Sequence, residues 1–303
     1  MEFFKTNTKI DFMGLRKWTA CLSAAIFSIS IAALLIHGLQ WGLDFTGGTQ
    51  IEIFYRQPAD LTMIRQNLAK AGFTEAQVVS YGTSKDVLIT LAPRQDLEQT
   101  LLVEKVMEQL PGATKQRADF IGPQVGKELA TKGVLAIIIS LLATMFYIAM
   151  RFEYRLAVSA AIALIHDPVL ILGIFAIFGV EFDLKALAGL LAVIGYSLND
   201  TIVVFDRVRE NFVKIRRVPT IEIMNIAINQ TLSRTIMTSA LTLCVVVVLF
   251  IYGGAAIHGF ALALIIGIII GTYSSIYVAG ALAVVMGLDR KDFLPQPKLE
   301  IGP

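Results

Sequence analysis

The chain has 303 residues, of which 55% are hydrophobic, and its formal net charge at pH 7 is +2. Its mean hydropathy of +0.68 lies well above that of a soluble domain, so the composition excludes an ordinary soluble protein. We therefore expect an integral membrane protein, and the near-neutral charge gives no reason to expect a nucleic-acid partner.

Six apolar runs are each long enough to cross a bilayer as a helix, for which about 20 residues suffice. They are residues 18–37, 133–150, 156–179, 186–205, 236–252 and 259–287. The predicted fold class is an α-helical membrane protein with six transmembrane helices and one large external domain. Residues 1–17 form an N-terminal segment, 38–132 the external domain with its linkers, 133–287 a five-helix bundle, and 288–303 a tail.

Lys and Arg are concentrated before the first span, between the second and third, between the fourth and fifth, and after the last. Such residues mark the cytoplasmic ends of membrane helices. Both termini are therefore predicted to be cytoplasmic, and the large loop is predicted to lie on the outer side of the membrane.

A glycine-rich segment, GLDFTGGT, follows the first span at residues 42–49. Gly42, Gly47 and Gly48 indicate tight turns or a close approach of two backbones. Asp44 either caps a turn or belongs with these glycines to a hinge that lets the external domain move on its anchor. The segment does not match GxxxxGK[ST], which argues against nucleotide binding.

The external region alternates between strand and helix patterns. Strands are predicted at 51–55, 77–81, 87–92 and 114–120, with helices at 61–71 and 95–110. Residues 82–86 should form a hairpin turn, and residues 121–126 a bent linker back to the membrane. In the second helix, Leu97, Leu101 and Leu110 are expected to face inward. The β-α-β-β-α-β order predicts a small ferredoxin-like α+β domain. It contains no cluster of metal-ligating residues, so binding or mechanics is favoured over catalysis.

Two spans contain acidic residues within the membrane, near the middle of the third span and in the inner half of the fourth. His166-Asp167-Pro168 lies in the third span, where the pair either satisfies the helix turn broken by Pro168 or forms a titratable site. Asp200 lies in the fourth, where a charge costs about 3 kcal/mol on insertion scales. A buried cation, a bound proton or a water-filled passage would offset this cost, whereas a neutral, hydrogen-bonded Asp200 would only join helices. Asn199 and Asp200 are expected to face different neighbours inside the bundle rather than lipid.

The cytoplasmic segment 206–235 has a basic first half and an apolar stripe in its second half. This pattern predicts a helix lying in the membrane interface, which brings Arg234 to the start of the fifth span. Arg234 then either pairs with Asp200, which lies at a similar depth, or extends toward the lipid headgroups. In the sixth span, Gly267 and Gly271 form a GxxxG pattern, which favours tight packing in the bundle or sliding against a partner.

Four motifs resemble the SecF proteins of the SecD/SecF family, in the RND superfamily. They are GLDFTGGT, HDP in the third span, GYSLNDTIVVFDRVREN in the fourth and NQTLSRTIMTS entering the fifth. The resemblance implies a bacterial inner-membrane protein that pairs with SecD, associates with the SecYEG translocon and other export accessory membrane proteins, and acts on a translocating polypeptide. It would use the proton gradient and no cofactor. The resemblance also makes Asp200 the proton-relay carboxylate and Arg234 its basic partner, with lesser roles for Asp167 and Asn199.

Two other functions are compatible with parts of the sequence. A stand-alone RND-type exporter of small molecules would usually carry a duplicated set of spans, whereas this chain has a single set. An intramembrane enzyme is disfavoured because the three histidines, His37, His166 and His258, form no HExxH motif and no serine lies in GxSxG. The chain is therefore predicted not to be an enzyme.

Overall fold

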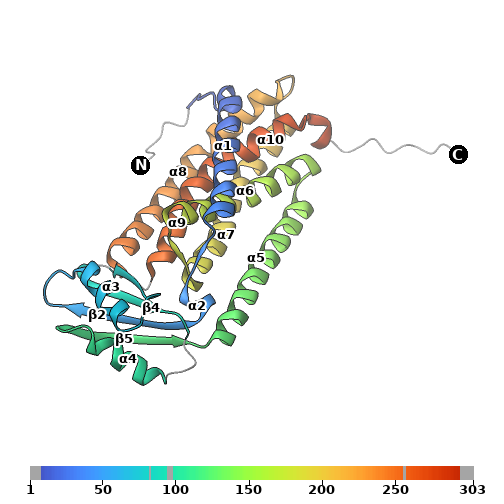
Figure 1. Ribbon diagram of the computed structural model, residues 1–303. Helices are drawn as coiled ribbons and strands as arrows, with labels where there is room; N and C mark the ends of the chain where they lie inside the picture. The colour runs from blue at the N-terminus through green and yellow to red at the C-terminus, as the bar shows by residue number, and fades with distance from the viewer. Residues whose placement is uncertain (1–7, 82, 94–97, 255–256, 294–303) are drawn as a thin grey trace.

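The computed structural model describes residues 8–81, 83–93, 98–254 and 257–293. Long helices form one part of the molecule and a small α+β domain lies at one end (Figure 1). Within the described residues, six helical segments are long and apolar enough to cross a membrane, as predicted. They are α1 (Arg16–Ile36), α5 (Pro123–Arg151), α6 (Tyr154–Phe178), α7 (Leu184–Lys214), α8 (Thr220–Tyr252), and α9 (His258–Ser274) continued by α10 (Gly280–Val285).

The last span is one continuous helix with a local change of pitch. Between α9 and α10, residues Ser275–Ala279 form a π-helical turn. Such turns occur mostly as single bulges inside α-helices, and frequently at functional sites. The start of α1 and the end of α10 lie at the end of the molecule opposite the sheet (Figure 1). This arrangement agrees with an even number of membrane crossings.

The prediction that residues 206–235 contain a separate helix lying in the membrane interface is wrong. Residues 206–214 continue α7, and residues 220–235 are the first half of α8, which runs without interruption to Tyr252. The residues from Thr220 to Tyr252 include no glycine or proline that would break the helix. The apolar stripe of this segment, including Met224 and Ile228, is buried in one core with Phe205 and Phe212 of α7. It therefore packs on protein and not on the membrane surface.

The connection from the external domain to the second span is shorter than predicted. Strand β5 (Ala113–Ile121) ends one residue before Gly122, which is the N-cap of α5. Pro123 occupies the first turn of α5, where its missing N–H costs nothing. The predicted linker 121–126 is thus mostly helix.

The external domain is an antiparallel sheet with two helices. The strand order is β3 (Gln77–Tyr81), β4 (Thr83–Leu91), β2 (Gly48–Tyr55), β5, and the helices are α3 (Leu61–Lys70) and α4 (Gln99–Glu108). Every neighbouring pair of strands is antiparallel. Side chains of both helices share one core with the alternating residues of β2 and β4, so both helices cover the same face. This is the predicted ferredoxin-like order of elements.

Two details of that domain differ from the sequence-based prediction. Residues 83–86 belong to β4 and not to a hairpin turn. Leu101 is 47% exposed, and the inward positions of α4 are Leu102, Val103 and Val106, while Leu110 is buried as predicted. The predicted inward residue Leu97 lies outside the described residues.

The glycines of the last span pack tightly against α7 within the bundle. A Cβ at Gly267 would overlap both methyl groups of Val193, and one at Gly271 would lie 2.9 Å from Cβ of Ser197. On α7, a Cβ at Gly189 would lie 2.8 Å from the carbonyl oxygen of Phe260. Of the two expectations for the GxxxG pattern, the structure shows tight packing inside the chain.

Replacing Gly267 by Ala should therefore destabilise the bundle. We expect a loss of about 1–3 kcal/mol, because an added methyl group in a closely packed site forces the helices apart. Gly195→Ala is the matched control, since Gly195 lies inside the neighbouring helix α7 and a Cβ there meets nothing within 4 Å. Adding Val193→Ala to Gly267→Ala should restore part of the stability. Thermal unfolding of the purified variants measures this, and equal midpoints for the two single alanine variants would contradict the packing argument.

Candidate functional site

Asp200 lies in the interior of the membrane bundle with 2% of its surface exposed. It comes from α7, and Ser239 of α8 donates a long hydrogen bond of 3.4 Å from its Oγ to Oδ2 of Asp200. Ser239 also contacts Oγ1 of Thr272 in α9 at 2.9 Å and accepts a hydrogen bond from the hydroxyl of Tyr196 at 3.2 Å. Ser239 thus connects the carboxylate to a small group of hydroxyls from three helices.

Arg234 does not pair directly with Asp200 in this structure. Its side chain is exposed on α8, and among the described residues no ion pair joins the two groups. The positive charge of Arg234 nevertheless acts electrostatically on the carboxylate without contact. The predicted contact between Arg234 and Asp200 is therefore not formed: Arg234 lies on the surface of the chain and Asp200 in its interior.

Asn199 is exposed, which corrects the prediction that it faces the inside of the bundle. Successive helix residues are rotated by about 100°, and Asp200 takes the inward direction. Asn199 consequently presents an amide on the outer surface of a membrane helix. A polar group at such a position is costly in lipid and is usually covered by another protein segment.

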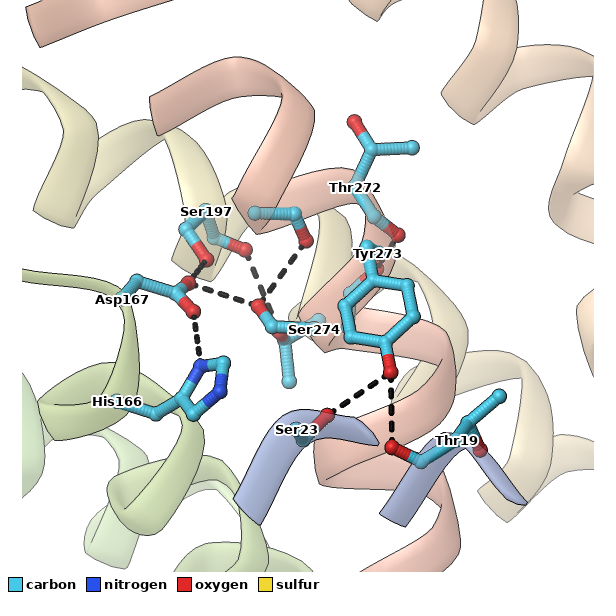
Figure 2. A network of polar contacts seen from close by, with 11 residues as sticks. Thr19, Ser23, His166, Asp167, Ser197, Thr272, Tyr273 and Ser274 are labelled. Carbon is cyan, nitrogen blue, oxygen red and sulfur yellow. Dashed lines mark hydrogen bonds and ion pairs between the residues drawn. The ribbon is translucent and has the colours of Figure 1, made fainter. Parts of the chain in front are cut away.

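Asp167 is the centre of a buried polar network, shown in Figure 2. Its Oδ2 accepts hydrogen bonds from Oγ of Ser197 at 2.5 Å and Oγ of Ser274 at 2.7 Å. Its Oδ1 lies 3.0 Å from Nδ1 of His166. The network joins α6, α7 and α9, and Ser274 is the last residue before the π-helical turn. Asp167 is therefore bonded across helices, and its hydrogen bonds go to side chains rather than to the turn at Pro168.

Ser197 connects the two acidic sites. It lies three residues before Asp200 on α7, so both side chains are on the same face of the helix, and both are buried. The sequence did not predict a role for Ser197 or Ser274, because a serine in an apolar span is common and carries no charge. The only available signal was the spacing of Ser197 from Asp200.

A row of hydroxyl groups on α8 leads toward Asp200. Thr231, Thr235 and Ser239 are spaced four residues apart, so they lie on one face, and all three are buried. Oγ1 of Thr235 has no hydrogen-bond partner among the described residues. Buried hydroxyls normally find partners, so this unpaired group marks a place where a water molecule or a rearranged side chain would be stabilised.

The glycine-rich segment is folded against the starts of α5 and α7. It follows β1 (Gln40–Trp41), which pairs in parallel with β6 (Glu181–Phe182), and it contains the single turn α2 (Leu43–Thr46). Oδ2 of Asp44 accepts a hydrogen bond of 2.9 Å from the backbone N–H of Leu184, the first residue of α7. Asp44 thus caps a distant helix, beside that helix's own N-cap residue, Asp183.

Glu181 adds a second link between these segments. Its Oε1 accepts a hydrogen bond of 3.2 Å from the N–H of Leu43, and burial raises the pKa of its carboxyl. Asp183 and Asp44 nearby raise this pKa further. Two acidic side chains, Asp44 and Glu181, therefore hold the glycine-rich segment next to the helix that carries Asp200.

Gly42, Gly47 and Gly48 each occupy a position that a larger residue would disturb. Gly47 and Gly48 have φ angles of 71° and 135°. A Cβ at Gly48 would overlap the carbonyl oxygen of Leu91, one at Gly47 would lie 2.9 Å from Cα of Pro123, and one at Gly42 would lie 2.9 Å from Cβ of Asp183. These contacts describe a tightly packed connection between the external domain and the bundle.

No group of three or more His, Cys, Asp or Glu side chains that could hold a metal ion occurs in the described part of the chain. The titratable side chains that the described residues bury inside the bundle include two carboxyl groups and one imidazole, with several hydroxyls beside them. Groups of this kind can bind and release protons.

A six-span bundle with two buried carboxylates and an external ferredoxin-like domain has the architecture of one half of an RND-type membrane protein. Residues 102–289 match the family model "Protein export membrane protein SecD/SecF, C-terminal", and residues 32–59 match "SecD/SecF GG Motif". The chain belongs to the SecD/SecF family. The second match contains the glycine-rich segment with Gly47 and Gly48.

Curated relatives and solved structures agree with this assignment. The chain is 46% identical to "Protein translocase subunit SecF" of Vibrio alginolyticus, covering 99% of this chain and 96% of the relative. It is 44% identical to the protein of the same name from Escherichia coli O157:H7, covering 94% and 90%. The crystal structure of the translocon-associated membrane protein SecDF from Thermus aligns with a TM-score of 0.86 at 34% identity, over 94% of this chain and 39% of that one.

Proposed function

We propose that this protein is a subunit of the bacterial protein-export machinery that works with SecD and uses the proton gradient to promote late steps of polypeptide translocation. Its similarity to translocase subunits named SecF, over nearly the full length of both chains, supports the role in protein translocation. We further propose that these steps take place on the outer side of the membrane, at the external domain.

The proposed association with SecD is supported by fused relatives. The chain matches 39% of the length of "Protein translocase subunit SecDF" of Brucella abortus, with 38% identity over 96% of this chain. A fusion of two subunits in one organism favours their association as separate chains in another. The SecYEG translocon and further export accessory membrane proteins are additional partners in this proposal, and the translocating polypeptide is the substrate.

We place the protein in the bacterial inner membrane, with both termini in the cytoplasm and the external domain in the periplasm. The distribution of Lys and Arg supports this orientation. We propose that SecD covers the surface of α7 and α8 that carries the exposed Asn199 and Arg234. A partner on this surface would also bring its own polar groups close to Arg234.

The observation that carries the proton-driven part of the proposal is the burial of Asp200, which among the described residues has one long hydrogen bond and no ion pair. A carboxylate in this state is poorly stabilised, so it favours binding a proton. Moving one charge through the membrane potential yields about 2.3 kcal/mol per 100 mV, which is enough to bias two packings of a helix bundle.

The structure suggests how such a change would reach the external domain. Asp200 lies on α7, whose first residue, Leu184, is bonded to Asp44 of the glycine-rich segment. That segment leads directly into β2 of the external domain. A shift of α7 would therefore move the start of the sheet, and we propose that Gly42, Asp44, Gly47 and Gly48 transmit this movement.

In this proposal the protein is not an enzyme and needs no cofactor, because the proton gradient supplies the free energy. The alternative of a stand-alone small-molecule exporter is not favoured, since the relatives are translocase subunits and the chain has a single set of spans.

Isolation of the tagged protein from its native membranes in mild detergent tests the proposed assembly. We expect SecD and SecYEG to be recovered with it. Asn199→Trp should reduce recovery of SecD, because a bulky ring would separate the two surfaces, whereas Ala25→Trp, at another exposed membrane position, should not. Recovery of a homo-oligomer without SecD would contradict the proposal and support the exporter.

A further inference from the structure

A groove on the outside of the membrane bundle lies between α1, α6 and α10. Its volume is about 520 Å³, and its walls are mostly apolar, including Ile162, Val278 and Leu282. The small residues Ala20, Ala24 and Ala281 create the space. At the deep end Phe27 and His166 stack with ring centroids 5.7 Å apart. The groove is separate from the face of α7 and α8 that carries Asn199 and Arg234.

The charges at the groove are all positive. Arg16 and Lys17 line it at the first turn of α1, and no acidic residue is among the described residues that line it. The guanidinium of Arg16 donates a 2.9 Å hydrogen bond to the carbonyl of Met13, which holds it in place. Cations at the end of a membrane helix attract anionic lipid headgroups, by about 1 kcal/mol for each Lys or Arg.

The length of the groove matches one leaflet of a bilayer. Lys17 and Phe27 are ten residues apart on α1, which corresponds to about 15 Å at 1.5 Å per residue. The hydrocarbon core of a bilayer is about 30 Å thick, so the groove extends from the headgroup level to the middle of the membrane. This is the depth that one acyl chain occupies.

We propose that this groove binds an anionic phospholipid from the leaflet at the start of α1. The phosphate contacts Arg16 and Lys17, and one acyl chain lies along α1 as far as Phe27. The chain covers the ring of His166, whose Nε2 is buried and has no hydrogen-bond partner among the described residues. Bound lipid would thus separate the His166–Asp167 pair from water on that side. The binding site itself does not depend on the proposed proton relay.

Native mass spectrometry of the purified full-length protein tests this site. With phosphatidylglycerol as the probe and phosphatidylcholine as the comparison, we expect selective retention of phosphatidylglycerol. The double variant R16Q/K17Q should lower this retention about thirtyfold, because two cation–phosphate attractions are lost. The matched control is R209Q/R216Q, which removes two exposed Arg residues that do not line the groove. Equal loss in both double variants would overturn the proposal.

A second pair of variants tests the acyl chain without changing charge. Ala24→Trp should fill the groove and displace the lipid, whereas Ala25→Trp adds the same ring at the next, exposed position outside the groove. We expect loss of retained phosphatidylglycerol only for Ala24→Trp. If Ala24→Trp retains as much lipid as the wild type, or if phosphatidylcholine binds equally well, the groove is not an anionic lipid site.

Discussion

Replacing Asp200 by Asn should abolish the stimulation of export by the proton gradient while the protein remains inserted in the membrane. Asn is nearly the same size and can accept the hydrogen bond from Ser239, so the packing of α7 on α8 should persist. It cannot bind or release a proton at neutral pH, so the proposed relay loses its central group. The measurement is the rate of polypeptide export into membrane vesicles with and without an imposed gradient. We expect the two rates to become equal.

The matched control is Asp206→Asn, six residues further along the same helix. Asp206 is partly exposed and forms an ion pair of 2.5 Å with Arg151 at the end of the membrane helices. Exposed ion pairs contribute about 0–1 kcal/mol, so this variant should keep most of the stimulation. If Asp200→Asn retains a normal response to the gradient, the relay is wrong and Asp200 only joins helices.

The sequence predicted the positions of the two intramembrane acids because a carboxyl group in an apolar run is costly and therefore conspicuous. Their partners were harder to predict. Ser197, Ser239 and Ser274 are small side chains that are tolerated at many positions of membrane helices. Which of them meets a carboxylate depends on how the helices cross, and that is decided by glycine contacts such as Gly271 on Ser197.

The predicted contact between Asp200 and Arg234 failed because it rested on depth alone. Ser239 faces Asp200, and Arg234 lies five residues earlier on α8. Five residues correspond to about 500° of rotation, so the two side chains point about 140° apart. Arg234 therefore cannot share the inward direction of Ser239 on a regular helix. The direction in which a side chain leaves the helix, and not its depth alone, therefore places Arg234 on the surface.

The external domain was easier to predict, because strand and helix periods alternate clearly in a soluble segment. Its order of elements followed from hydrophobic periodicity and from signals such as the N-cap Asp60, whose side chain accepts from the N–H groups of Thr62 and Met63. The inward face of α4 was misassigned at Leu101. Consecutive leucines at 101 and 102 fit either face, and only packing on the sheet selects Leu102.

The role of the glycine-rich segment could not be decided from its composition, because glycine permits both flexible hinges and close packing. The contacts of the segment favour close packing. Gly48 is the first residue of β2, pairs with Ile121 of β5, and has a φ of 135°. It lies where the external domain meets the bundle, with Asp44 four residues before it.

Replacing Gly48 by Ala should therefore loosen the external domain and reduce export. The backbone conformation at this position costs a residue other than glycine about 1–3 kcal/mol, and the methyl group would also overlap the carbonyl of Leu91. We expect the domain to lose at least about 3 kcal/mol of stability in total. Pulse proteolysis of the full-length protein measures this loss, and the vesicle assay measures export.

Gly122→Ala is the matched control at the other connection between the external domain and the bundle. Gly122 has a φ of −64° and a ψ of 146°, which any residue adopts, and a Cβ there would come no closer than 3.9 Å to another residue. This variant should resist proteolysis and support export as the wild type does. Gly48→Ala should fail in both assays if the segment transmits movement as a packed connection. Normal export by Gly48→Ala, despite a loosened domain, would show that α7 does not act on the sheet through this segment.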